Sequence, residues 1–171
     1  MAVTFVPEHP IHAAAIERVL DAAFGPGRYA KVSERVREGA SLDYARSRVA
    51  LSGGRLIGCC RMWPMRVGEG RAFFLGPLAI DPRLQRTGLG ARLVEATLEA
   101  ANATTFDAVV LVGRPQFFSR FGFVQIPDGR VRLPGPVEPA RLQWLALPRG
   151  RLDRCAGALS PLRAASPASR S

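Results

Sequence analysis

The sequence predicts an α+β fold, a three-layer α/β arrangement in which helices cover both faces of a mixed, mostly antiparallel central sheet. Three successive runs, at 45–51, 56–67 and 72–80, are rich in strand-forming residues and are separated by glycine-containing turns. This pattern is typical of an antiparallel meander. A helical pattern at 88–101 and a β-rich run at 106–112 follow, and this order predicts a parallel strand after a right-handed crossover.

The remaining elements are shorter. Before the meander, the pattern predicts a strand at 3–6 and two helices, at about 10–24 and 29–38, each of which ends at a glycine. After the crossover we expect a short helix at 116–120, a strand entered through 121–126, a loop over 127–140 and a last strand at 142–147 that pairs near Val124.

Composition indicates one globular domain. The chain has 171 residues, 47% hydrophobic and 22% charged, so residues 1–159 are expected to form a single domain. Residues 160–171 are mainly Ser, Pro, Ala and Arg and are expected to fray. No run approaches the about 18 apolar residues of a membrane helix, and no signal-peptide pattern is present. Three cysteines without framework spacing favour a reducing compartment, so we expect a cytoplasmic protein.

The net charge of +10 does not by itself indicate nucleic-acid binding. The arginines are scattered along the chain, with no basic run and no interleaved aromatic stripe. Attraction of a polyanionic cofactor explains the charge equally well. An RNA- or ribosome-associated role is kept as a weaker alternative.

Two groups of chemically versatile residues are interpreted as structural. His9 and His12 have no cysteine or carboxylate cluster beside them, so no metal site is expected there. Cys59 and Cys60 lie in a predicted strand without a histidine nearby in sequence. Buried packing therefore explains them better than a nucleophilic role.

Residues 75–94 combine an apolar run, Asp81-Pro82, a loop with arginine, glutamine and glycine, and the start of a helix. A helix N-terminus presents free N–H groups to anions, and glycines let a ligand approach the backbone. A Walker loop is excluded because the chain's only lysine, Lys31, is far from this loop. A dinucleotide fingerprint lacks its third glycine. The stretch therefore predicts a phosphate cradle of another kind.

The loop Gln85-Arg86-Thr87-Gly88-Leu89-Gly90 resembles the Gln/Arg-x-x-Gly-x-Gly/Ala pattern of the GNAT superfamily of acyl-CoA-dependent N-acyltransferases. Gly113-Arg114-Pro115 and residues 117–123 (FFSRFGF) resemble a later motif of that superfamily. The combination looks most like its bacterial YhbS-type branch, with the strongest similarity over about 73–126.

The resemblance implies a cofactor, a fold detail and a reaction. The cofactor is acetyl-CoA (coenzyme A), and the reaction is acetyl transfer to a primary amine in a ternary complex. The fold detail is a splayed strand pair that admits the pantetheine arm, and the Gly76-Pro77 break in a predicted strand fits it. The residues that the resemblance assigns to the cofactor are Leu78, Ala79, Ile80, Gln85, Arg86, Thr87, Gly88, Leu89, Gly90, Ala91, Phe117 and Phe118.

No catalytic residue is assigned from the sequence. Many superfamily members have a tyrosine acid four residues before the glycine of the Gly-Phe turn, and this chain has Phe118 there. The thiolate then leaves unaided, or Tyr29 or Tyr44 supplies a donor, or the domain is a non-catalytic acyl-CoA-binding or regulatory module. The general base is also open, because Asp81 is expected to cap the loop.

The expected acceptor is a small-molecule or peptide amine, and the sequence does not identify it. The sequence also leaves open whether the protein forms a homodimer. By resemblance, the two early helices form a wall of the acceptor pocket. This makes Phe24, Arg28 and Tyr29 candidate substrate contacts, although core packing of Phe24 and surface exposure of the other two explain them as well.

Overall fold

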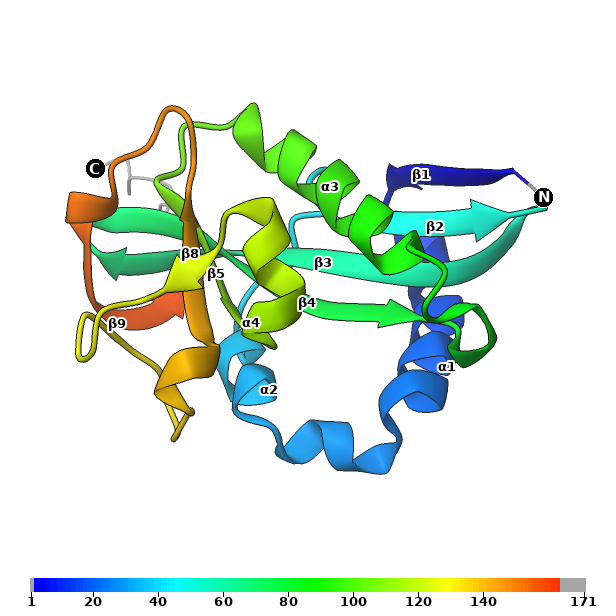
Figure 1. Cartoon of the computed structure of the whole chain (residues 1–171), viewed down its shortest axis with the longest axis horizontal. Helices are drawn as coiled ribbons and strands as arrows, with labels where there is room; N and C mark the ends of the chain where they lie inside the picture. The colour runs from blue at the N-terminus through cyan, green and yellow to red at the C-terminus, as the bar shows by residue number, and fades with distance from the viewer. Residues whose placement is uncertain (1, 164–171) are drawn as a thin grey trace, which may run out of the picture.

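A computed structural model of the chain describes residues 2–163 (Figure 1). The strands are β1 (Val3–Pro7), β2 (Arg48–Ser52), β3 (Arg55–Gly68), β4 (Gly70–Ile80), β5 (Ala108–Val112), β6 (Val124–Gln125), β7 (Val131–Arg132), β8 (Leu142–Ala146) and β9 (Cys155–Pro161). The α-helices are α1 (Ala13–Phe24), α2 (Val32–Arg37), α3 (Leu89–Asn102) and α4 (Pro115–Phe118). Short 3-10 helices include η1 (Pro10–His12), η2 (Pro26–Ala30), η3 (Pro82–Leu84) and η4 (Ser119–Phe121).

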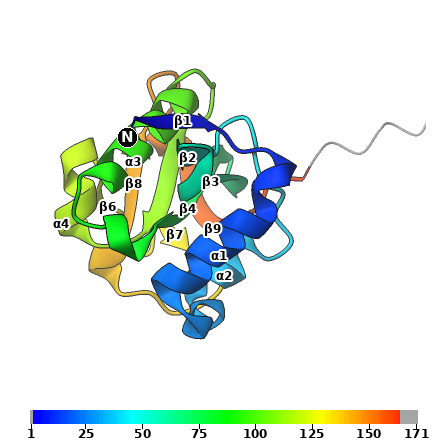
Figure 2. The same ribbon diagram turned by 90° about the vertical axis from the view of Figure 1, so that its right-hand side faces the viewer.

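The central sheet is mixed, as expected. Its strand order is β1-β2-β3-β4-β5-β8-β6, and β4–β5 is the parallel pair on this path. The meander β2–β3–β4 is antiparallel, and β6 pairs with β8 through Val124 and Trp144, which confirms the expected partner. Helices α3 and α4 lie on one side of the sheet, and α1 and α2 lie on the other (Figures 1 and 2).

Alternation along β3 builds both layers. Cys60 and Met62 point into the core under α3, whereas Cys59 points into the core under α1. The α3 helix buries Leu93 and Val94 completely because its apolar residues recur at helical spacing. Each such side chain contributes about 1.5–3 kcal/mol of burial free energy. The two helical layers therefore hold β3 and β4 rigidly between them.

The Gly76-Pro77 dipeptide forms the expected irregularity of β4. Leu75 pairs with Met62 and Leu78 pairs with Cys60, so two residues of β4 lie opposite the single residue Arg61. This is a β-bulge, and it redirects the strand locally. On the other side, β4 pairs with β5 at 72–74 and has no partner strand beyond that point within residues 2–163. The two parallel strands therefore splay where the bulge occurs.

Three expectations were wrong in detail. The strand at 142–147 is not the last one, because β9 follows it and pairs with β3 at positions 65–68. Ser160 and Pro161 belong to β9 and not to a frayed tail, while residues 164–171 lie outside the described residues. The expected helix at 29–38 is divided into η2 and α2, because Lys31 takes an extended conformation between them.

Candidate functional site

The loop from β4 to α3 is rigidly held at its base and open at its tip. The Asp81 carboxylate accepts the Arg83 N–H at 3.0 Å and pairs with the guanidinium groups of Arg55 and Arg83 at 2.9 and 2.8 Å. Asp81 is therefore the capping residue that the sequence predicts, and it is not free to act as a base. Beyond it, Gln85 to Gly88 are exposed to solvent.

The N-terminus of α3 is arranged to bind an anion. Gly88 has φ +83° at the N-cap, a left-handed conformation that glycine adopts without strain, and no side chain caps the helix. A Cβ on Gly88 would meet no atom within 4 Å, so the space beside this glycine is open. Partial positive charge at this end of the helix adds to the attraction.

The free edge of β4 leads to this helix end. Leu78, Ala79 and Ile80 pair with β3 on one side only, because β5 diverges after Phe74. The Ile80 carbonyl accepts a 3.5 Å hydrogen bond from the Gln85 side chain, and the other backbone groups on the β5 side are available to an extended ligand. The structure thus places the edge residues of β4 next to the Gln85–Ala91 loop, so that the two could contact one extended ligand.

The two phenylalanines of α4 have different surroundings. Phe117 is half-buried, and its ring lies 3.8 Å from the position that a Cβ on Gly90 would occupy, so it borders the anion-binding loop. Phe118 is 8% exposed and packs against Phe123 and Gly113. A Cβ on Gly113 would overlap the Phe118 ring, which shows how closely that ring is enclosed. Phe118 thus serves core packing, and it has no proton to donate.

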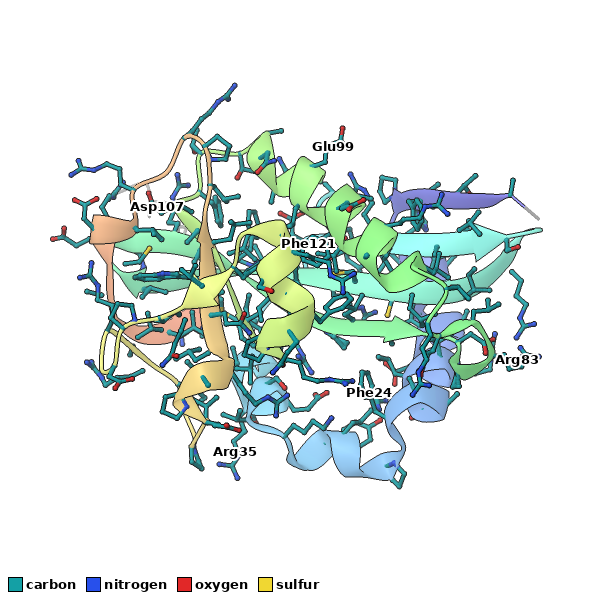
Figure 3. All side chains as sticks on the ribbon, in the orientation of Figure 1. Phe24, Arg35, Arg83, Glu99, Asp107 and Phe121 are labelled. Carbon is teal, nitrogen blue, oxygen red and sulfur yellow. The ribbon has the colours of Figure 1, made fainter. Side chains whose placement is uncertain are left out.

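A pocket of about 460 Å³ lies on the α1–α2 side of β4. It is called the acceptor pocket here, after the role that the resemblance implies for the two early helices. Its wall includes Pro77 of the bulge and Trp63 of β3, whose indole Nε1 donates to the Gly76 carbonyl at 2.6 Å. Of the three expected substrate contacts, Arg28 and Tyr29 line this pocket. Phe24 lies outside the lining, at the end of α1 (Figure 3). The ammonium group of Lys31 lies 4.7 Å from the centre of its ring.

The pocket is rich in paired charges that sequence reasoning did not find. The pairs are Arg28 with Glu17 at 2.5 Å, Arg37 with Glu34 at 2.6 Å and Arg61 with Glu8 at 2.7 Å. Glu34 and Arg37 are an i,i+3 pair within α2, whereas the other two pairs join η2 to α1 and β3 to the segment after β1, so no local motif contains all three. One signal was present: Arg61 interrupts the buried run of β3.

A larger cavity of about 720 Å³ lies between α1 and the β2–β3 hairpin. Its charged lining includes Arg55, Asp81 and Arg83, which already pair with one another. Neither the bulge nor residues 78–80 of β4 line this cavity, so it is separate from the site formed by the free edge of β4 and the Gln85–Ala91 loop.

The cysteines are not nucleophiles. Burial raises the pKa of the Cys59 and Cys60 thiols to about 12, so both are neutral thiols at physiological pH. The interpretation of these residues as core packing is confirmed by their complete burial. His9 and His12 form a reciprocal cap at the start of η1, which accounts for their spacing.

Comparison with known proteins identifies the family. A model of the acetyltransferase (GNAT) family matches residues 13–123. The chain is 33% identical over 144 residues to an uncharacterized N-acetyltransferase, YhbS, of Escherichia coli K12, with 81% of this chain and 85% of that protein covered. The chain belongs to the GNAT acetyltransferase family.

Solved GNAT structures are similar in fold. The crystal structure of E. coli YhbS in complex with CoA matches with a TM-score of 0.77 and 28% identity, covering 94% of this chain and 89% of that one. A GNAT acetyltransferase of Brucella melitensis in complex with acetyl-CoA matches with a TM-score of 0.61 and 27% identity, covering 88% and 94%. The α+β architecture and the resemblance to the YhbS branch are thereby confirmed.

No helix in residues 2–163 is long and apolar enough to cross a membrane.

Proposed function

We propose that the protein transfers an acetyl group from acetyl-CoA to a primary amine by direct attack in a ternary complex. The observation that carries the proposal is the free edge of β4, which runs into the open N-terminus of α3 on one side and borders the acceptor pocket through Pro77 on the other. One strand therefore separates a cofactor site from an acceptor site.

The free edge of β4 and the Gln85–Ala91 loop suit coenzyme A. Backbone groups of Leu78, Ala79 and Ile80 would pair with the pantetheine amides, as an added strand does. The N–H groups from Gln85 to Ala91 would hold the pyrophosphate. Phe117 would cover the arm where it passes α4. Bound acetyl-CoA supplies the thioester from which the acetyl group is taken.

The acceptor pocket would hold the amine against the bulge. The reaction requires a neutral amine, and Glu34 and Glu38 are carboxylates on its wall. Glu34 is paired with Arg37, so the proton would leave through Glu38 or through water in the pocket. For the leaving thiolate, Phe118 supplies nothing. Tyr29 is the tyrosine that lines the pocket, and its hydroxyl accepts a hydrogen bond from Arg28 at 2.5 Å.

A second candidate is a non-catalytic acyl-CoA-binding or regulatory module. The enclosed Phe118 side chain favours it, because the usual tyrosine acid of the family is replaced by a ring in the core.

A cytoplasmic location also stays a prediction, based on the three unpaired cysteines of the sequence.

Calorimetry with acetyl-CoA and a thiol-release assay with a broad panel of amines test the function. We expect acetyl-CoA to bind at concentrations below millimolar, and we expect thiol release with at least one amine. Gly88→Trp should abolish binding, because its side chain would fill the space in front of the helix N-terminus. Absence of cofactor binding would refute both candidates. Binding without thiol release on every amine would favour the module.

A further inference from the structure

Three arginines of the acceptor pocket are withdrawn from solvent. The side chains of Arg28, Arg37 and Arg61 are 7%, 9% and 14% exposed. Arginine is rarely buried to this degree unless its charge is paired, and each of these guanidinium groups has a carboxylate partner. Pairing explains why the charges are tolerated, but it leaves some of their donors unused.

The unused donors open into the pocket. Arg37 donates from Nη2 to Glu34, and Arg61 donates from Nε and Nη2 to Glu8. Within residues 2–163, the Nη1 groups of Arg37 and Arg61 have no acceptor. In this part of the chain, every side-chain nitrogen or oxygen that is fully buried has a hydrogen-bond partner, so a nitrogen without an acceptor is not fully buried. These Nη1 groups are therefore accessible to solvent, and both arginines line the acceptor pocket.

These donors lie beside the bulge that separates the two sites. Nη1 of Arg37 is 3.5 Å from the position that a Cβ on Gly76 would occupy. Arg61 is the single β3 residue opposite Gly76 and Pro77. A ligand that contacts both guanidinium groups would thus be held next to the wall through which the acceptor must meet the cofactor.

We propose that the acceptor is a small amine that also carries an anionic oxygen group, either a carboxylate or a phosphonate or phosphate, and that Arg37 and Arg61 bind this group. The inference rests on the proposed function, because it defines the substrate class of the same pocket. Guanidinium groups bind such oxygens with charge-assisted hydrogen bonds. Glu34 and Glu38 in the same wall attract the ammonium end. An amine without the anion would displace water and leave the arginine donors unsatisfied, at a cost in affinity.

Matched amines test this directly. Binding to the complex of the 171-residue protein with CoA is measured by calorimetry for tyrosine against tyramine, 4-aminobutyrate against butylamine, and 3-aminopropylphosphonate against butylamine. Acetyl transfer is measured for the same compounds. We expect at least one anionic compound to bind roughly 10- to 100-fold more tightly than its match without the anionic group, as one or two charge-assisted hydrogen bonds would give. Comparison of the carboxylate and phosphonate arms identifies the anion.

Variants assign the preference to the pocket. Arg37→Gln should reduce the ratio of the two affinities at least about tenfold, the loss expected for one charge-assisted bond, and Arg37→Lys should restore part of it. The matched control is Arg18→Gln, which removes one exposed positive charge from α1 outside the acceptor pocket. Because each ratio is measured within one preparation, it does not depend on the folded fraction.

The outcomes separate the two proposals. Selective binding of anionic amines without acetyl transfer would support an anion-binding role of Arg37 and Arg61 in the pocket and refute the proposed catalysis. Acetyl transfer to both members of every pair with equal preference would overturn the substrate class and leave catalysis supported. An unchanged ratio in Arg37→Gln would overturn the assignment to this residue.

Discussion

The indole Nε1 of Trp63 donates a 2.6 Å hydrogen bond to the carbonyl of Gly76, across the bulge that separates the acceptor pocket from the free edge of β4. The bond fixes the bulged part of β4 to its neighbouring strand. Because Trp63 also lines the pocket, one side chain defines both the shape of the wall and the position of the bulge. Trp63 is therefore a positioning residue for the proposed reaction.

Trp63→Phe should lower the free energy of unfolding by about 1–3 kcal/mol, because the Gly76 carbonyl loses its donor. It should also raise KM for the amine more than it raises KM for acetyl-CoA. Urea denaturation and steady-state kinetics measure the two effects. Trp144→Phe is the matched control, since Trp144 is buried in β8 away from the pocket. Equal changes in both variants would show that the loss is one of packing alone.

The glycines of the cofactor loop should respond oppositely to alanine. Gly88→Ala should destabilise the fold by about 1 kcal/mol, because its φ of +83° is strained for any residue with a Cβ. Gly90→Ala should stabilise it by about 0.5–1 kcal/mol, because a Cβ there meets only atoms at 3.8 Å and the position is helical. Thermal unfolding of both variants checks the pair, and equal shifts would contradict the loop geometry.

Phe118→Tyr should leave the acetyl-transfer rate within about tenfold of the wild type, because the ring lies in the core and not in the acceptor pocket. The buried hydroxyl should cost about 1–3 kcal/mol of stability if it finds no partner. Thiol release and urea denaturation provide the measurements. Activity that appears only in the tyrosine variant would instead favour the non-catalytic module for the natural chain.

Stability should fall at alkaline pH through Cys59 and Cys60. Burial raises their folded-state pKa from 9.0 to about 12, so the fold binds protons that the unfolded chain releases between these values. The contribution is fully present below about pH 9 and is lost as pH rises toward 12, by up to about 1.4 kcal/mol per pH unit and thiol. Denaturation from pH 8 to 10.5 measures the slope, and a Cys59→Ala/Cys60→Ala variant should show a shallower one.

Local signals predicted the elements that carry the cofactor site. Gly76-Pro77 in a strand-like run predicted the bulge, and the glycines before Leu89 predicted the start of α3. These features are encoded by neighbouring residues, because turn conformation, proline's missing N–H and helical periodicity act over a few positions.

The features that were missed depend on distant pairings. β9 contains Gly157 and ends in Ser160-Pro161, a composition typical of loops, and it is a strand because the far half of β3 offers it an edge. Arg61 and Glu8 are far apart in the sequence, and only the folded sheet brings this pair to the same pocket as the Arg37–Glu34 pair of α2. Charged residues of this kind look like surface residues in the sequence.

The single bulged strand between the two sites has a consequence for inhibitor design. Pro77 faces the acceptor pocket, and Leu78 begins the edge proposed for the cofactor, so adjacent residues of one strand border both sites. A compound that joins the sulfur of CoA to the nitrogen of an anionic amine through a short acyl linker would span that wall. Its affinity should exceed that of either part alone by a large factor, because one binding event places both ends. The linker length that binds best would measure how closely the two sites approach each other at Pro77.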